Sequence, residues 1–189
     1  MEAKKGRREM KKFELTTEFI TNAFGKKLFR IKALVEFGDV KAGELGGYVE
    51  KEGNVSQAGN AWVYGNARVS GDARVYGDAE VYGNARVYGD ARVSDNAWVY
   101  GDARVCGNAW VYGNADYALV QGFGTEFRCT TFYRGKNKKI MVNCGCFHGD
   151  LEGFRKQVKE TRNGKIAKEY LMIADLMEYH FTSEDSSDE

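Results

Sequence analysis

The sequence predicts a mainly β protein built around a parallel β-solenoid, and three observations lead to this fold class. Six-residue repeats run without interruption through the middle of the chain. The 189 residues include no proline, although ordinary usage of about 5% would give about nine. Glycine, by contrast, occurs 23 times. A chain that turns on glycine and lacks proline keeps nearly every backbone N–H available for a ladder of hydrogen-bonded strands.

The repeats are nine consecutive hexads between Gly59 and Tyr112, most of them of the form Gly-Asn/Asp-Ala-X-Val-Tyr/Ser. Valine recurs at every sixth position and is expected to point inward, with alanine two residues earlier on the same face of the strand. The Gly-Asn or Gly-Asp pair forms the turn, because these residues tolerate positive φ. Asp95 replaces this glycine once, and degenerate copies occupy residues 53–58 and 113–118. The glycine-rich nonapeptide pattern of calcium-binding repeats is absent, so the corner Asn and Asp residues are interpreted as turn formers.

A short strand and a turn every six residues give flat faces that meet at corners. The hexads resemble the hexapeptide repeats of left-handed parallel β-helices. This resemblance implies a left-handed triangular coil of 18 residues per turn, and therefore about three regular coils. Successive coils stack at about 4.8 Å, so residues 18 apart are expected to lie above one another.

The residues on either side of each valine are expected to face outward in stacked columns. Tyrosine, tryptophan and arginine dominate interface hot spots, and exposed aromatic patches of this density are rare on monomers. Stacked arginines repel unless tyrosine faces, carboxylates or a ligand lie between them. The alternative is that these side chains only shield the strands from solvent. The candidate binding residues are Trp62, Tyr64, Arg68, Arg74, Tyr82, Arg86, Tyr88, Arg92, Trp98, Tyr100, Arg104, Trp110 and Tyr112.

Smaller units are expected on both sides of the solenoid, which spans residues 47–118. Residues 10–46 are interpreted as a β cap, with a hairpin formed by residues 13–19 and 28–37. Residues 119–181 are interpreted as an α+β domain, with a hairpin at 130–146 and helices at 150–162 and 165–181. Residues 1–9 and the acidic residues 182–189 are expected to be disordered.

The inventory of reactive side chains argues against catalysis. Enzymes with the hexapeptide-repeat fold that this sequence resembles are chiefly acyltransferases, which use a histidine base near a trimer interface. Some are carbonic anhydrases with three imidazole ligands on zinc. This chain has only His148 and His180, and both lie outside the hexads. We therefore predict no catalytic residue and no cofactor. The alternative is an acyltransferase that uses acetyl-CoA and His148 at a subunit interface.

Other reactive groups have two interpretations each. Cys129 is expected opposite Cys144, and with Cys146 and His148 it would supply a zinc ligand set. Because the C-x-C-x-H spacing is not that of a standard zinc finger, small buried thiols are the favoured interpretation and no metal is predicted. Cys106 is expected on an outer face and inert. The basic residues at 134–139 are interpreted as a solvated hairpin tip, with anion binding as the alternative.

Composition restricts the class of function. The formal net charge is +1, whereas a dedicated nucleic-acid binder would carry a large basic excess. Apolar runs are too short for a membrane-spanning helix, and the N-terminus lacks the apolar core of a secretory signal. Four cysteines do not suggest a disulfide framework. We expect a cytoplasmic protein.

Segments outside the hexads carry a second resemblance. They are KKFELTTEF (11–19), FGKKLFRIKAL (24–34), GELGGYVEKEGN (43–54), TTFYR (130–134), CGCF (144–147) and AKEYL (167–171). The chain resembles hexapeptide-repeat proteins of phages and mobile elements, which implies a phage setting but no established activity. The function we predict is that of a non-enzymatic homo-oligomer, a trimer or dimer, that binds a host protein or a small nucleotide signal. Such a protein would act as an anti-defence inhibitor or sponge.

Overall fold

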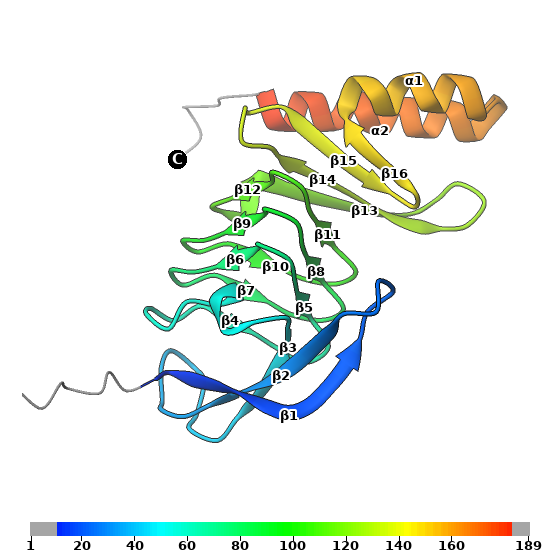
Figure 1. Ribbon diagram of the computed structural model, residues 1–189. Helices are drawn as coiled ribbons and strands as arrows, with labels where there is room; N and C mark the ends of the chain where they lie inside the picture. Colours follow the sequence, from blue (N-terminus) through cyan, green and yellow to red (C-terminus); the bar gives the residue numbers. More distant parts are fainter. Residues whose placement is uncertain (1–10, 183–189) are drawn as a thin grey trace, which may run out of the picture.

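The computed structural model describes residues 11–182, which form three successive parts (Figure 1). The first is an antiparallel hairpin of β1 (Phe13–Thr21) and β2 (Lys27–Ala33), followed by β3 (Leu45–Val49). Strand β2 ends at Ala33 rather than continuing to residue 37, and a loop connects it to β3. The disorder predicted for residues 1–9 and 183–189 lies outside the described residues. Thr182, expected in the tail, is the last residue of a helix.

The second part is a parallel β-solenoid with three faces. Each face is a sheet of short strands that pair with strands 18 residues away, as Arg86 does with Arg68 and Arg104. The 18-residue turn predicted from the hexads is therefore confirmed. Face 1 contains β3, β5 (Arg68–Val69), β8 (Arg86–Val87) and β11 (Arg104–Val105); face 2 contains β4 (Trp62–Val63), β7 (Glu80–Val81) and β10 (Trp98–Val99); face 3 contains β6 (Arg74–Val75), β9 (Arg92–Val93) and β12 (Trp110–Val111).

The solenoid has about four turns, one more than the regular hexads predict. Strand β3 pairs in parallel with β5, and Val55, next to the 3-10 helix η1 (Glu52–Asn54), bridges to Val75. Gly47 stands where the hexads have alanine, two residues before Val49. A Cβ atom on Gly47 would lie 2.6 Å from the Ala67 carbonyl oxygen, so only glycine fits at this position. This turn therefore departs from the repeat pattern in sequence but continues it in space.

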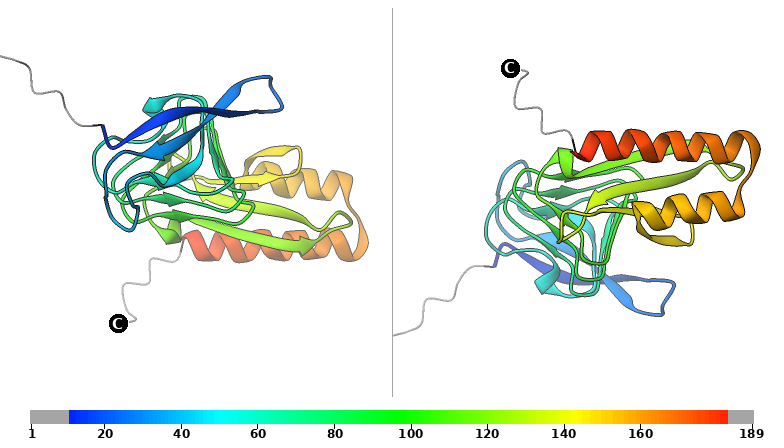
Figure 2. Two further views of the ribbon diagram at one scale, coloured as in Figure 1. Left: turned by 90° about the horizontal axis from the view of Figure 1, so that it is seen from below. Right: turned by 90° about the horizontal axis from the view of Figure 1, so that it is seen from above.

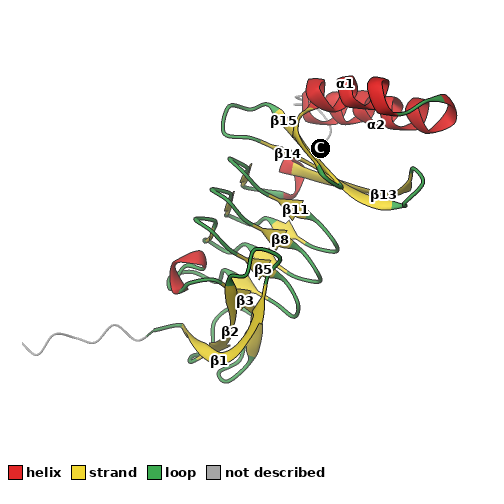
Figure 3. Ribbon diagram, turned by 45° about the vertical axis from the view of Figure 1, so that its right-hand side comes forward, coloured by secondary structure: helices red, strands yellow, loops and turns green. Residues whose placement is uncertain are grey.

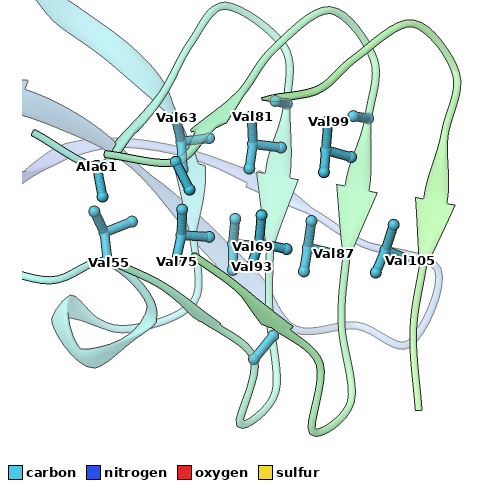
Figure 4. Packing of buried hydrophobic residues seen from close by; sticks show 14 of the residues in the cluster. Val55, Ala61, Val63, Val69, Val75, Val81, Val87, Val93, Val99 and Val105 are labelled. Atoms are coloured by element: carbon cyan, nitrogen blue, oxygen red, sulfur yellow. The ribbon is translucent and has the colours of Figure 1, made fainter. Parts of the chain in front are cut away.

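The interior of the solenoid is a stack of valines and alanines. Every hexad valine and alanine is fully buried, and Figure 4 shows valines from the three faces pointing toward one another. Valine suits the extended backbone, and the small alanine allows neighbouring faces to approach closely. The inward orientation predicted for both residues is confirmed.

The corner glycines differ in how closely the next turn approaches them. Gly77 and Gly65 both have positive φ, 69° and 56°. A Cβ atom on Gly77 would lie 2.9 Å from the backbone nitrogen of Asp95, whereas one on Gly65 would meet nothing within 4 Å.

We expect Gly65→Ala to lower the free energy of unfolding by about 1 kcal/mol, from backbone strain alone. We expect Gly77→Ala to lower it by about 2–4 kcal/mol, because a steric clash is added to the strain. Urea unfolding of both variants measures the difference. Equal losses would contradict the importance of close stacking at this corner.

The third part is a four-stranded antiparallel sheet covered by two helices. The sheet contains β13 (Tyr117–Phe123), β14 (Arg128–Arg134), β15 (Ile140–Cys144) and β16 (Phe147–Asp150), and the 3-10 helix η2 (Asn114–Asp116) precedes it. The predicted hairpin corresponds to β14 and β15, and the structure adds two strands to it. The predicted helices are present as α1 (Leu151–Thr161) and α2 (Gly164–Thr182). As expected, Asp150 caps α1 by accepting a hydrogen bond from the Gly153 N–H.

The two end units project to the same side of the solenoid. Figure 2 shows this from both ends, and Figure 3 shows the β1–β2 tip and the β13–β14 loop on the side of β5, β8 and β11. Face 1 is therefore bordered at both ends, which makes it the concave side of the molecule.

Candidate functional site

The predicted binding residues are divided among the three faces and do not form one surface. Pairing in register places side chains 18 residues apart above one another, as expected. Face 1 carries Arg68, Arg86, Tyr88 and Arg104; face 2 carries Trp62, Tyr64, Tyr82, Trp98 and Tyr100; face 3 carries Arg74, Arg92, Trp110 and Tyr112.

Trp62 is not a surface residue, and its assignment to an exposed column is wrong. Its side chain is fully buried. Phe13 of β1 and Phe37 of the β2–β3 loop contact its ring edge-on, with centroid distances of 5.8 and 5.3 Å. Trp62 does point away from the solenoid interior, but the N-terminal unit covers it.

Of the remaining aromatic residues of face 2, Trp98 and Tyr100 are exposed, whereas Tyr64 and Tyr82 are partly buried. Tyr82 and Tyr100 stack with a centroid distance of 5.5 Å, and Tyr117 of β13 packs edge-on against Tyr100. Tyr64 is half-buried, and burial together with the nearby Glu80 carboxylate raises the pKa of its hydroxyl to about 12. Tyr82 and Tyr100 therefore stabilise the stacking of turns and the contact with the C-terminal unit.

Face 3 combines charges of both signs. Arg74 and Arg92 line two pockets on this face: one of about 780 Å³ with Glu52, and one of about 340 Å³ with Asp72 and Asp90. The Arg92 guanidinium lies 5.5 Å from the Trp110 ring centroid. Face 3 therefore mixes cationic, anionic and aromatic side chains, and Arg92 makes a cation–π contact.

The lysines of the basic hairpin tip are exposed, whereas Arg134 is engaged within the protein. Arg134 forms an ion pair with Asp116 at 3.1 Å and donates to the Phe181 carbonyl oxygen. The Lys139 ammonium lies 3.6 Å from an Asp150 carboxylate oxygen. Neighbouring carboxylates therefore neutralise part of this cluster, and the exposed lysines agree with the interpretation as a solvated hairpin tip.

Face 1 carries a column of three arginines, Arg68, Arg86 and Arg104, which we call the arginine ladder. Each pairs in register with the next. Among the side chains that the structure describes, no carboxylate lies within 4 Å of a ladder guanidinium. Burial and the positive charges of Arg68 and Arg104 lower the pKa of the Arg86 guanidinium, although Asp102 acts weakly in the opposite direction. The ladder therefore carries positive charge that no ion pair with a described carboxylate compensates.

Two pockets flank the ladder, and all three arginines line both of them. Pocket A, of about 440 Å³, lies toward the β13–β14 loop; its other lining residues are Asn66, Asn84, Asp102, Gln121, Phe127, Cys129 and Gly145. Pocket B, of about 410 Å³, lies toward the β1–β2 tip; its other lining residues are Asn22, Ala23, Phe24, Lys26, Leu28, Glu50, Ser70, Gly71, Val87, Tyr88 and Gly89. We call the ladder and the two pockets together the arginine groove.

The repeat pattern predicted the floor of this groove but not its walls. Phe24 and Phe127 are exposed aromatic residues at the tips of loops outside the hexads. The one sequence signal for Phe24 is its position in a turn, between Asn22 and Gly25. No sequence pattern relates two residues about one hundred positions apart, and only the fold places them beside one ladder.

The solenoid meets the C-terminal sheet at a buried polar cluster. Cys106, expected on an outer face, is covered by the sheet: its sulfur lies 3.3 Å from the Tyr133 hydroxyl and 3.3 Å from the Asn143 amide nitrogen. Asn143 also donates to the Tyr88 hydroxyl. Nε2 of His148, the candidate acyltransferase base, lies 3.0 Å from the Tyr133 hydroxyl. His148 is exposed at the edge of this cluster, and each buried member has a partner within it, which is typical of a structural junction.

The residues of the alternative zinc interpretation do not converge. In the β14–β15 pair, Thr130 and not Cys129 lies opposite Cys144. A one-residue shift moves a side chain to the other face of a strand, so the expected pairing of Cys129 with Cys144 is wrong. Within residues 11–182, no three His, Cys, Asp or Glu side chains are close enough to hold a metal ion, and the four cysteines are free thiols.

Comparison with known families agrees with the solenoid. The model of the YdcK beta solenoid repeat matches residues 61–77, 67–82, 79–95, 85–101 and 91–107. These matches cover most of the regular hexads. The similarity to this repeat family is therefore found within residues 61–107. A search of curated proteins found no match. None of the helices in the described part of the chain is long and apolar enough to span a membrane.

Proposed function

We propose that this β-solenoid protein binds a small phosphate-bearing nucleotide signal in the arginine groove, without transforming it. The observation that carries the proposal is the arginine ladder between two pockets. Two carboxylates line the pockets, Asp102 and Glu50, and Glu50 is paired with Lys26, so the three guanidiniums keep a positive field that attracts anions into the groove. Each pocket falls within the range of about 300–1,000 Å³ that is usual for small-molecule sites.

Phosphate suits this floor better than other anions do. The planar guanidinium donates paired hydrogen bonds that match two oxygens of one phosphate group. Rungs of the ladder repeat at about the 4.8 Å spacing of β-strands, so neighbouring arginines can share one phosphate group or bind adjacent ones. A ligand with a single carboxylate would leave part of the ladder unpaired.

The biological setting and the finer classification belong to the same proposal. Membership of the left-handed hexapeptide-repeat superfamily and a phage or mobile-element origin are supported by the resemblance of the sequence. In such a setting, a protein that holds a nucleotide signal would act as a cytoplasmic sponge against a host defence. An acidic host protein docking on the ladder is the alternative partner.

The proposal includes self-association into a dimer, for which α2 offers a surface. Met172, Leu176 and Tyr179 are exposed apolar residues that follow one another at helical spacing on its outer side. In an antiparallel pair of α2 helices centred on Leu176, Met172 of one copy lies near Tyr179 of the other, so the apolar stripe is complementary to itself and a second copy of this chain is its occupant.

We expect Leu176→Lys to convert the dimer to a monomer, because it places charge at the centre of the apolar stripe. Light scattering coupled to size exclusion measures the mass. Trp98→Lys, which changes an exposed apolar residue on the solenoid, is the control and should leave the dimer intact. A monomeric wild-type protein would overturn this part of the proposal.

Titration calorimetry with inorganic triphosphate tests the binding function. We expect saturable binding that weakens by about tenfold or more when sodium chloride rises from about 50 mM to about 500 mM, because salt screens the ladder. Absence of binding at low salt would contradict the proposal. A second sample with acetyl-CoA and a thiol reagent tests the acyltransferase alternative, since release of free thiol would show chemistry and not only binding.

A further inference from the structure

The arginine ladder lies between two pockets whose remaining walls have different chemistry. Pocket A contains the corner side chains Asn66, Asn84 and Asp102, which precede the ladder arginines by two residues. Pocket B contains Ser70 and Tyr88, which follow the arginines by two residues. A ligand bound to the guanidiniums therefore has one pocket on each side.

Each pocket also has one exposed phenylalanine. The side chain of Phe24 is 86% exposed in pocket B, and that of Phe127 is 67% exposed in pocket A. The backbone of Phe24 is held in its turn by a hydrogen bond from its N–H to Asn22 Oδ1, 2.9 Å long.

The backbone at Phe127 is strained. Its φ is 47°, in the left-handed region, which costs about 1–2 kcal/mol for a residue with a side chain. An exposed aromatic ring on a strained backbone contributes little to folding. Strain of this kind is typical of positions that serve binding.

We propose that the groove binds a dinucleotide, with its phosphates on the arginine ladder and one base stacked on each phenylalanine. This inference rests on the proposed function and names the ligand class. Bases stack on aromatic side chains through their π faces, and the guanidiniums hold the phosphates between the two bases. A mononucleotide would occupy only one of the pockets.

The two base sites are not equivalent. Pocket A offers side-chain amides from Asn66, Asn84 and Gln121 and the Asp102 carboxylate, so it favours a base with N–H donors on its edge. In pocket B, Lys26 is paired with Glu50 and the Tyr88 hydroxyl accepts a hydrogen bond from Asn143, so this pocket selects less by hydrogen bonding.

The ends of face 1 limit the length of the ligand. Below Arg68, the next rung is Tyr48, whose hydroxyl is hydrogen-bonded to Glu18 and Arg30. At the other end, the Arg104 N–H donates to Thr131 of the C-terminal sheet. The groove is therefore occupied at both ends by the protein itself, which favours a dinucleotide over a long strand.

Calorimetry with four probes tests this inference: the linear dinucleotide pGpG, 3′,5′-cyclic diguanylate, GMP and inorganic pyrophosphate. We expect at least one of the two dinucleotides to bind about tenfold or more tightly than GMP. Phe24→Ala and Phe127→Ala should each weaken dinucleotide binding by about tenfold and leave pyrophosphate binding unchanged. Trp98→Ala, at an exposed ring on face 2, is the matched control and should change neither.

Two outcomes would overturn the inference. One is equal affinity for GMP and both dinucleotides. The other is equal weakening of pyrophosphate and dinucleotide binding by the phenylalanine variants, which would indicate a general effect on the groove. Neither outcome removes pyrophosphate binding from the wild-type protein, so failure of the dinucleotide assignment is distinguishable from failure of the proposed function.

Discussion

Arg86→Glu is expected to weaken binding of inorganic triphosphate by more than a hundredfold. Arg86 is the middle rung of the ladder and pairs in register with Arg68 and Arg104. The substitution removes one positive charge, and the new carboxylate occupies the two neighbouring guanidiniums as a competing anion. Loss of a charge-assisted hydrogen bond costs about 1.5–3 kcal/mol, and the repulsion between the carboxylate and the phosphate adds to this.

Arg74→Glu is the matched control because it makes the same change at the same position of a hexad on face 3. It should reduce triphosphate affinity by less than about threefold, since only the long-range field changes. An equal loss in both variants would show that net charge, rather than the arginine groove, controls binding.

Removal of the Arg86 charge should make the ligand-free protein more stable, although it weakens ligand binding. Like charges directly opposite each other in a sheet are destabilising, and the positive charges of Arg68 and Arg104 contribute to the lowered pKa of Arg86. Arg86→Gln is therefore expected to raise the free energy of unfolding by about 0.5 kcal/mol while it weakens binding. Urea unfolding without ligand measures this. A clear decrease in stability would indicate a structural role for Arg86.

The solenoid could be predicted because its determinants are local and periodic. Valine and alanine recur every six residues, so each coil has the same interior and residues 18 apart become neighbours. The turn through β3 was less visible in the sequence because Gly47 replaces the usual alanine and the spacing from Tyr48 to Arg68 is 20 residues. Here tertiary contact, and not the repeat, specifies the pairing.

The environment of the outward residues depends on segments without periodicity. Trp62 and Trp98 occupy the same hexad position on the same face, but Phe13 and Phe37 cover only Trp62. Cys106 is buried for the same kind of reason, under the C-terminal sheet.

One part of the candidate site could be predicted from the repeat, and the other part could not. Its arginine column follows from the repeat, whereas Phe24 and Phe127 come from loops whose positions only the whole fold determines. The register of β14 and β15 also depends on tertiary packing, which is why Cys129 is not the residue opposite Cys144.

The second large expected effect is the loss of stability when Trp62, but not Trp98, is replaced by alanine. Trp62→Ala should lower the free energy of unfolding by about 3–5 kcal/mol, as is usual when a large buried aromatic residue is truncated. Its side chain is fully buried, and its removal leaves a cavity between face 2 and the N-terminal unit. Trp98→Ala, at a residue that is 49% exposed, should cost less than about 1.5 kcal/mol.

A third variant separates packing from hydrogen bonding at Trp62. The indole Nε1 is buried without a partner among the described residues, so Trp62→Phe removes an unsatisfied donor together with part of the ring. We expect this variant to lose about 1–2 kcal/mol, well below the loss for alanine. Equal losses for Trp62→Ala and Trp98→Ala would mean that the N-terminal unit does not pack on face 2. Because this unit also forms one wall of pocket B, such a result would remove Phe24 from the arginine groove as well.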